Sequence, residues 1–381
     1  MPNPAKAAAP AARASVAVEA HRRVPTEDMD DTVELNDYDG RIEDGHAEYA
    51  PLHNALALLQ STIHAPFRRC DREAIRYQKW YQWTAIFAVF FGALTILLAI
   101  LEFIVKPPEP RILTWGEPAT AGLTLLLIGV GTFGKFKENW LTARYKAENL
   151  RLLKFRKLTD SRLWCPPIDM GLLAEELQDE VRQLEAQNYE EAKEWASQGV
   201  HPCVCGPPCT DTCDEALHEL IEYYRPKRLH VQMRYLSRKS KADEESGWRT
   251  AILVQTIFFA SFAFVLAHVA LHVNAILAAK AAATAGAKAE ASTFLEQCLI
   301  GAAVALPVFA AGLRTFRASR EFERNALRHR ATLDSLETLE AQLRESKDLA
   351  EKFRVLGFCE LVLEADCRDF MRLLCEVEWY G

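Results

Sequence analysis

Four long stretches of the chain contain no Lys, Arg, Asp or Glu. Each is at least as long as the roughly 17 to 25 residues that an apolar helix needs to cross the hydrocarbon core of a membrane. This pattern excludes a soluble protein, a disordered protein and a secreted disulfide scaffold. We therefore expect an all-α membrane protein with four transmembrane helices. The stretches are Tyr81–Leu101, Pro118–Gly134, Thr250–Ala279 and Gln297–Leu313.

The net charge of -7 is concentrated at the start of the chain. Residues 1–50 hold eleven acidic and five basic residues, and so supply six of the seven net negative charges. Their Ala- and Pro-rich opening and their acidic stretch contain few aromatic residues, a composition typical of a disordered tail. No apolar core of a signal peptide follows the first residues. The rest of the chain is nearly neutral, so we expect no nucleic-acid partner.

The segments between the apolar stretches predict two hairpins of helices. Residues 102–117 are short and rich in proline, and residues 280–296 are short and rich in alanine. Lys and Arg gather instead on the opposite flanks, and basic residues near span ends mark the cytoplasmic side. We therefore expect both termini and a helical domain in the cytoplasm. The basic flanks are residues 68–79, 135–146, 225–249 and 314–330.

The chain divides into a tail and two similar halves. Each half has a basic approach, a span, a short link, a second span and a long charged helix that returns to the cytoplasm, which indicates a parallel internal repeat. The expected organisation is a disordered acidic tail (1–50), a first two-span unit with its approach and exit helices (51–160), a cytoplasmic helical insert with a Cys-rich turn (161–223), and a second two-span unit with C-terminal cytoplasmic helices (224–381).

Helical spacing of apolar residues also predicts the cytoplasmic helices. Leu52, Leu56, Leu59 and Ile63 belong to a helix that begins near residue 49 and leads into the first span, where Trp80, Tyr81 and Trp83 suit an interfacial belt. The leucines at 333, 336, 339 and 343 form a seam that we interpret as packing within a bundle, because it covers too few heptads for a coiled coil. Further helices are expected at residues 135–159, 170–198, 214–224 and 358–379.

Gly129, Gly131 and Gly134 reproduce the GxGxxG spacing of dinucleotide-binding loops. That fingerprint requires a strand before it and a helix after it, so that pyrophosphate meets the helix N-terminus. The sequence upstream of the glycines is instead apolar as far as Pro118, so the glycines belong to the second predicted span. If this segment did not cross the membrane, the chain would have three spans, and a strongly basic flank would lie on the wrong side of the membrane. We attribute the glycines to close helix packing through small residues.

Four cysteines fall within eleven residues of the insert: Cys203, Cys205, Cys209 and Cys213. A reducing cytoplasm disfavours disulfides, and four thiolates can complete a tetrahedral Zn²⁺ shell, which makes this turn a candidate structural zinc site. The spacing is not the paired C-x-x-C pattern of strong zinc sites. Thr212 and Glu215 form a capping-box pattern that would favour a reactive thiolate at Cys213. Redox-responsive thiols and an incidental turn therefore remain alternatives.

The few polar side chains within the spans are candidates for lining a pore, because a channel must replace the hydration shell of an ion. Spacings close to whole turns place them on shared helical stripes. The alternative is a role in helix contacts or at the membrane interface, since most lie toward the span ends. The candidates are Thr84, Thr95 and Glu102 in the first span and Ser261, His268 and His272 in the third.

The approach to the third span, from Tyr224 through Arg228, Gln232 and Tyr235 to Lys239, resembles the approach helix of SLATT domains, the SMODS- and SLOG-associating two-transmembrane effectors of bacteria. The helix after the second span, Trp140–Leu150, and the closing residues Glu376–Trp379 are similar to that family too. The resemblance covers residues 50–381 as two units in tandem. It implies a pore-forming effector of a bacterial defence system in the cytoplasmic (inner) membrane, triggered by a nucleotide-signalling partner.

The sequence favours a non-enzymatic protein, because no nucleophile elbow, HExxH pair, Walker loop or paired-carboxylate pattern is present. Four spans per chain are too few to enclose a sizeable pore, so we expect a homo-oligomer in the lipid bilayer. The alternative is a membrane-anchored scaffold or sensor whose cytoplasmic helices and Cys-rich loop bind a partner or zinc.

Overall fold

The computed structural model describes residues 50–105, 111–160, 164, 170–200, 214–285 and 293–376. The described residues are almost entirely helical and contain no strand, which confirms the all-α prediction. The helices are α2 (Ala50–Val105), α3 (Arg111–Phe133), α4 (Phe136–Leu158), α5 (Met170–Ala186), α6 (Tyr189–Ser197), α7 (Asp214–Tyr224), the π-helical turn η2 (Arg225–Leu229), α8 (His230–Ala285), α9 (Thr293–Arg320), α10 (Phe322–Glu345) and α11 (Leu349–Glu376).

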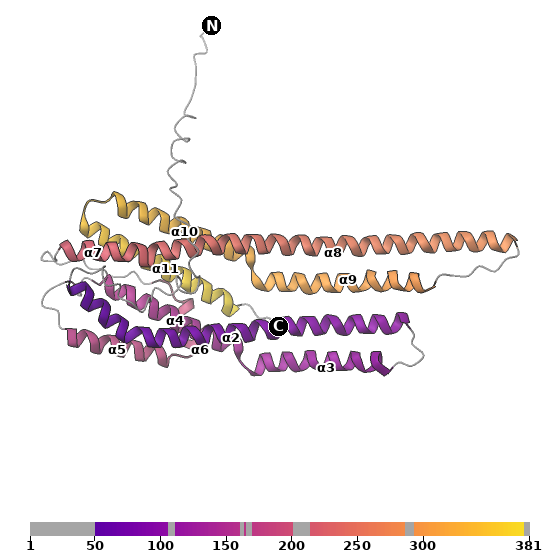
Figure 1. Ribbon diagram of the computed structural model, residues 1–381, viewed down its shortest axis with the longest axis horizontal. Coiled ribbons are helices and arrows are strands. Elements are labelled where there is room, and N and C mark those ends of the chain that lie inside the picture. The colour runs from indigo at the N-terminus through magenta and orange to yellow at the C-terminus, as the bar shows by residue number, and fades with distance from the viewer. Residues whose placement is uncertain are drawn as a thin grey trace, which may run out of the picture.

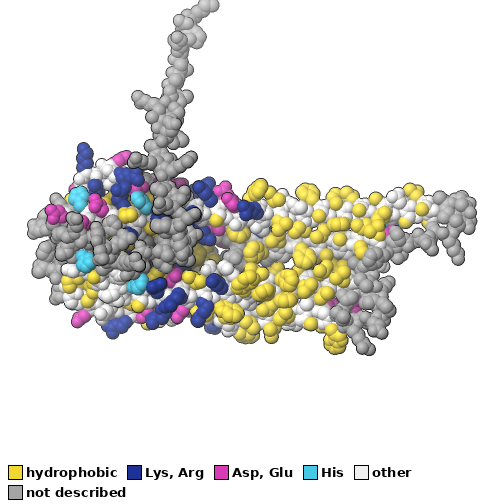
Figure 2. Space-filling view, viewed as in Figure 1, with side chains coloured by type: hydrophobic (Ala, Val, Ile, Leu, Met, Phe, Trp, Pro, Cys, Tyr) yellow, Lys and Arg dark blue, Asp and Glu magenta, His cyan; other side chains and the backbone are white. Residues whose placement is uncertain are grey.

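The four uncharged stretches lie in α2, α3, α8 and α9, apart from Gly134, which follows the last residue of α3. Each of these helices is long and apolar enough to span a membrane, as predicted. In the most apolar window of each helix at most 17% of the residues are buried. Apolar side chains therefore cover the surface of this half of the molecule, whereas charged side chains gather on the other half (Figure 2). A surface of this kind requires lipid or other apolar partners.

The four apolar helices lie side by side in a single row, in the order α3, α2, α9, α8 (Figure 1). α3 packs along α2, α9 packs along α8, and the two central helices contact each other. Small residues permit close approach. A Cβ at Gly116 would lie 3.3 Å from Cδ1 of Leu98, and a Cβ at Gly312 would lie 3.5 Å from Cγ1 of Val89. We call this arrangement the four-helix row.

The remaining helices, with the charged halves of α2 and α8, form a compact bundle that we call the head (Figure 1). The predicted apolar spacing at the start of α2 is confirmed, because Leu52, Leu56, Leu59 and Ile63 are all buried in its core. The leucine seam of α10 also packs into this core, with Leu336 and Leu343 buried and Leu333 and Leu339 partly buried. α10 contacts α8 and α11, as the bundle interpretation predicts.

The two halves of the chain break at corresponding points. Lys135 separates α3 from α4 and Glu321 separates α9 from α10, and both adopt left-handed backbone angles, with φ of 48° and 46°. A phenylalanine begins the next helix in each case. Non-glycine residues rarely adopt this conformation, so its recurrence supports the internal repeat.

The predicted helix at residues 170–198 is wrong in one respect, because it is two helices. The side chain of Asn188 accepts a hydrogen bond from the Glu191 amide at 3.1 Å, and the Glu191 carboxylate accepts one from the Asn188 amide at 2.7 Å. This capping box starts α6 and ends the continuity with α5. The last helix also begins earlier than predicted, at Leu349 instead of residue 358.

Two further sequence interpretations need correction. Tyr81 is buried and stacks on Trp140 at 5.7 Å, so it belongs to the head, whereas Trp80 and Trp83 are exposed as an interfacial belt requires. Gly129 lies in helix α3, with no strand before it, but a Cβ there would meet only Phe133 of the same helix, at 4.0 Å. Close packing against another helix of the chain therefore does not explain this glycine.

Candidate functional site

The hydroxyls of Thr84 and Thr95 in α2 are bonded within α2 or to α3. The hydroxyl of Thr84 donates to the carbonyl oxygen of Trp80 at 2.8 Å. The hydroxyl of Thr95 lies 2.9 Å from the carbonyl oxygen of Phe91 and 2.9 Å from the hydroxyl of Thr120 on α3. Thr95 thus joins α2 to α3. Glu102 lies half-buried near the end of α2, three residues before Val105.

Between α8 and α9, Ser261 has an equivalent role. Its hydroxyl donates to the carbonyl oxygen of Ala303 at 2.9 Å and so links α8 to α9. This bond fixes which residues of the two antiparallel helices lie at the same level. The structure therefore places Thr95 and Ser261 in helix contacts, which is one of the two roles that the sequence left open.

His268 and His272 are the two predicted pore residues that the structure brings together. They occupy successive turns of α8, with ring centroids 6.1 Å apart and ring planes 24° from parallel. Nδ1 of His268 is buried and has no hydrogen-bond partner among the described residues. His272 is exposed, on a stretch of helix whose exposed side chains are mostly apolar, such as Val269 and Val273, apart from the exposed Asn274.

The proposed zinc ligands Cys203, Cys205, Cys209 and Cys213 lie outside the described residues, as does the acidic tail. Within the described ranges, no group of three or more His, Cys, Asp or Glu side chains is arranged to hold a metal ion. The described cysteines include Cys359, whose thiol is buried in the head. Burial, together with the neighbouring Glu360 carboxylate, raises its pKa to about 12, so this thiol is unreactive at neutral pH.

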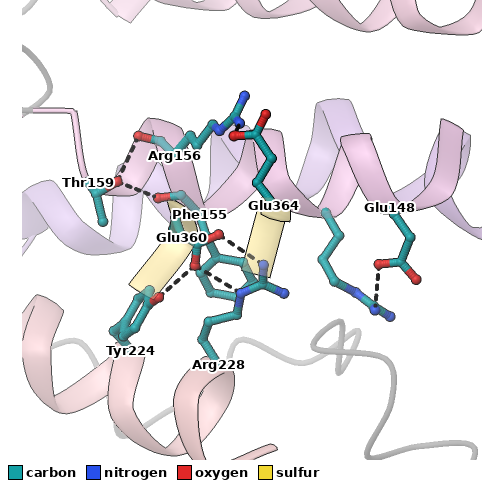
Figure 3. A network of polar contacts seen from close by, with 9 residues as sticks. Glu148, Phe155, Arg156, Thr159, Tyr224, Arg228, Glu360 and Glu364 are labelled. Carbon is teal, nitrogen blue, oxygen red and sulfur yellow. Dashed lines mark hydrogen bonds and ion pairs between the residues drawn. The ribbon is translucent and has the colours of Figure 1, made fainter. Parts of the chain in front are cut away.

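The head contains a network of buried ion pairs (Figure 3). At its centre, the guanidinium of Arg228 binds the carboxylate of Glu360 through two hydrogen bonds of 2.9 Å, and both side chains are at most 3% exposed. The hydroxyl of Tyr224 donates to the same carboxylate at 2.6 Å. The Arg228 guanidinium also lies over the ring of Phe155, 4.6 Å from its centroid. Because the two hydrogen bonds of such a bidentate contact run in parallel, they fix the orientation of Arg228 relative to Glu360.

The network continues along α11 and α4. Glu364 of α11 binds Arg156 of α4 and also Arg368, one turn further along α11, at 2.7 Å. The guanidinium of Arg368 in turn donates to the carbonyl oxygens of Trp195 and Gln198, at the end of α6. The residues that follow α6 lead to the Cys-rich turn. The network therefore connects the end of α6 to α4, the helix that follows α3.

The base of α8 is held by a second carboxylate. Glu340 of α10 accepts hydrogen bonds from Arg225 at 3.2 Å and Arg344 at 2.7 Å, and its Oε1 lies 2.7 Å from Nε2 of His230. Burial acts to raise the pKa of Glu340, but these partners outweigh it and lower the pKa to about 2. Glu340 and Glu360 therefore clamp the π-helical turn η2, from which α8 extends as one helix into the four-helix row. Interrupted helical turns of this kind often mark functional positions.

Sequence reasoning missed this network. Glu360, Glu364 and Arg368 recur at four-residue intervals, which places them on one helix face. The only feature of the sequence that could have indicated burial of these charges is that leucines and other apolar residues surround them. Arg225 and Arg228 were counted as part of a basic flank, whereas both are paired within the head.

Comparisons with family models, curated proteins and solved structures give no match. The functional argument therefore depends on the geometry of this chain.

Proposed function

We propose that the chain is one subunit of an oligomeric membrane pore or channel-type effector that permeabilises a membrane on a cytoplasmic signal. The observation that carries this proposal is the flat four-helix row (Figure 1). Helix axes pack about 8–10 Å apart, so the row is a wall roughly 35–40 Å wide. One wall encloses nothing, but several copies around a symmetry axis would enclose an opening.

In this proposal the row crosses the membrane as two hairpins and the head lies in the cytoplasm with both termini. The exposed Trp80 and Trp83 lie at the boundary between row and head, where amphipathic rings are stable. Exposed Arg76 and Lys79 adjoin them on the head side. Basic residues in this position are typical of a cytoplasmic boundary.

The head is the part that would receive the signal. α4 leaves the first hairpin and α8 leads into the second, and the Arg228–Glu360 pair joins the start of α8 to α11, which also binds α4 through Glu364. A partner that shifts α11 would therefore act on both hairpins. This is a physical route by which a signal in the head can reach the row.

The resemblance to tandem SLATT domains supplies the biological setting of the proposal. It suggests a bacterial inner-membrane effector of a defence system, assembled as a homo-oligomer and triggered by a nucleotide-signalling partner. A helical head joined to two pairs of apolar helices is compatible with that setting.

A membrane-anchored scaffold or sensor is the second candidate. It is favoured by the hydroxyls of Thr84, Thr95 and Ser261, which bond within their own hairpins and leave few polar groups on the row. In that case the apolar helices only anchor the head, and the Cys-rich turn binds a partner or zinc.

Leakage from vesicles distinguishes the two candidates. Purified protein is reconstituted at a series of protein-to-lipid ratios into vesicles loaded with K⁺ or with a dye, beside vesicles taken through the same procedure without protein. A pore predicts release that rises more steeply than in proportion to the amount of protein, because several copies must assemble. Vesicles that stay tight at every ratio, both without a trigger and with nucleotide second messengers added on the side of the head, contradict the pore and favour the scaffold.

A further inference from the structure

The two stacked histidines of α8 lie in a segment whose surface is mostly apolar, with the exposed Asn274 as a further polar side chain. A polar side chain in the hydrocarbon region is costly, and ionisable residues in spans usually mark a functional position. Residues four apart on a helix project from the same face, one turn from each other. The rings of His268 and His272 do so here, 6.1 Å apart and close to parallel.

The two rings present unused nitrogen atoms. Nδ1 of His268 is buried and makes no hydrogen bond within the described part of the chain, although a buried polar atom normally has a partner. His272 is exposed. A neutral imidazole nitrogen is a good ligand for late first-row divalent metal ions. Such ions bind at about 2.0–2.1 Å, so two ligand nitrogens must come within about 3.0–3.5 Å of each other, which rings on successive turns reach by side-chain rotation.

The pair lies far from the head along α8, and in the proposed membrane arrangement this is near the opposite membrane surface, where a metal ion can enter from water. The Ser261–Ala303 hydrogen bond pairs residue 261 of α8 with residue 303 of α9. The helices are antiparallel, so seven residues (about two turns) forward along α8 correspond to seven residues back along α9. His268 therefore lies at the level of Glu296. His272 lies one turn beyond, where α9 begins at Thr293. The pair therefore lies toward the end of α8 and α9 that is distant from the head, where the chain passes from one helix to the other (Figure 1). The half-buried Glu296 supplies a carboxylate at the same level to balance the charge of a cation.

We propose that His268 and His272 form a bidentate site for a late first-row divalent metal ion such as Cu²⁺, Ni²⁺ or Zn²⁺. The remaining positions of the metal are open to water or to a carboxylate. This inference goes beyond the proposed function, because it concerns binding and does not require the protein to conduct ions.

The test is a titration of the full-length protein with Cu²⁺ in detergent or nanodiscs. The protein carries no histidine tag, and Cys203, Cys205, Cys209 and Cys213 are replaced by Ser, so that thiolates of the insert do not contribute. We expect about one equivalent of Cu²⁺ per chain with an electron paramagnetic resonance spectrum that shows two coordinated nitrogens. His268→Gln and His272→Gln should each weaken binding by about tenfold or more and remove the two-nitrogen signature.

His53→Gln is the matched control, because His53 is an exposed histidine of the head, far along the chain from the pair. It should bind Cu²⁺ like the parent protein. Circular dichroism and gel filtration verify that each variant keeps its fold. Unchanged binding in the double variant of His268 and His272, or an equal loss in His53→Gln, overturns the proposed site. A protein that binds Cu²⁺ through this pair but leaves vesicles tight retains the site and loses the pore.

Discussion

Arg228 and Glu360 face each other inside the head, joined by two hydrogen bonds of 2.9 Å, with neither side chain more than 3% exposed. The pair links the base of α8 to α11. The fold of the head therefore depends on this buried ion pair. The proposed route of the signal from the head to the row passes through the same two side chains.

Loss of one partner of this pair should destabilise the head strongly. Arg228→Leu or Glu360→Leu leaves an uncompensated buried charge, which typically costs about 3–5 kcal/mol. The double variant should recover much of that loss, because two apolar side chains replace both charges. Thermal unfolding in detergent measures the difference. The control is Arg249→Leu, at an exposed ion pair in which the side chain of Arg249 is 75% exposed and that of its partner Glu245 is 65% exposed. This substitution should lower stability by less than about 1 kcal/mol. Equal effects at the two sites would contradict the assigned role.

The left-handed residues between row and head should tolerate glycine but not a β-branched residue. Lys135→Val and Glu321→Val place a branched side chain at φ near 48° and 46°, and should lower stability by about 1–3 kcal/mol. Lys135→Gly and Glu321→Gly should leave the unfolding temperature equal or higher, because glycine adopts this conformation without strain. Lys79→Val, on the exposed surface of α2, controls for helix propensity. If valine is harmless at both junctions, the backbone conformation there is not as described.

Thr95 should stabilise the packing of α2 against α3. Thr95→Val removes its bond to Thr120 of α3 and should destabilise the protein by about 0.5–1.5 kcal/mol. Thr132→Val is the matched control, since among the described residues this exposed hydroxyl bonds only to the Ile128 carbonyl within its own helix. If vesicles do leak, the ion selectivity of the Thr95→Val variant should equal that of the wild type. A changed selectivity with unchanged stability would instead assign Thr95 to the pore wall.

The head should lose stability as the pH falls from about 6.5 to about 4, and His329 should contribute to that loss. His329 of α10 is buried outside the apolar stretches, and burial, with Arg328 and Lys239 nearby, lowers its pKa to about 4. Asp243 lies 3.7 Å from Nε2, too far to outweigh burial. A lowered pKa means that the folded state favours the neutral ring, so the stabilisation is complete above pH 6.5 and declines toward pH 4.

Unfolding temperatures measured across this pH range test the prediction. His329→Gln, which cannot titrate, should flatten the decline between pH 6.5 and 4. The loss below pH 4.5 should remain, because it includes Glu340, whose pKa is lowered to about 2. An unchanged slope in His329→Gln would show that this histidine is not held neutral by the fold.

The elements that sequence alone predicted are those set by local pattern. Uncharged runs located α2, α3, α8 and α9, and Leu52 through Ile63 correctly marked a buried face, because hydrophobic periodicity does not depend on the partner helix. The break at Asn188 was missed although its capping partner is three residues away, since a longer amphipathic pattern concealed it.

The candidate site was less predictable, because it depends on residues that are distant in sequence. Arg228 and Glu360 are separated by 132 positions, and nothing local distinguishes a paired buried arginine from one in a basic flank. Likewise, the sequence placed Thr95 and Ser261 on helical stripes, but only the neighbouring helices showed that their hydroxyls join α2 to α3 and α8 to α9.

Every part of the proposed function requires the row to cross the bilayer with the head on one side. Labelling with a membrane-impermeant maleimide in sealed right-side-out vesicles tests this most directly, in a chain whose accessible native cysteines are replaced by serine. Glu109→Cys and Ala287→Cys report the two links of the hairpins, and Arg182→Cys reports the exposed surface of the head. We predict that both links label in intact vesicles and that position 182 labels only after permeabilisation. Labelling of either link only after permeabilisation, or of position 182 in intact vesicles, would contradict the account.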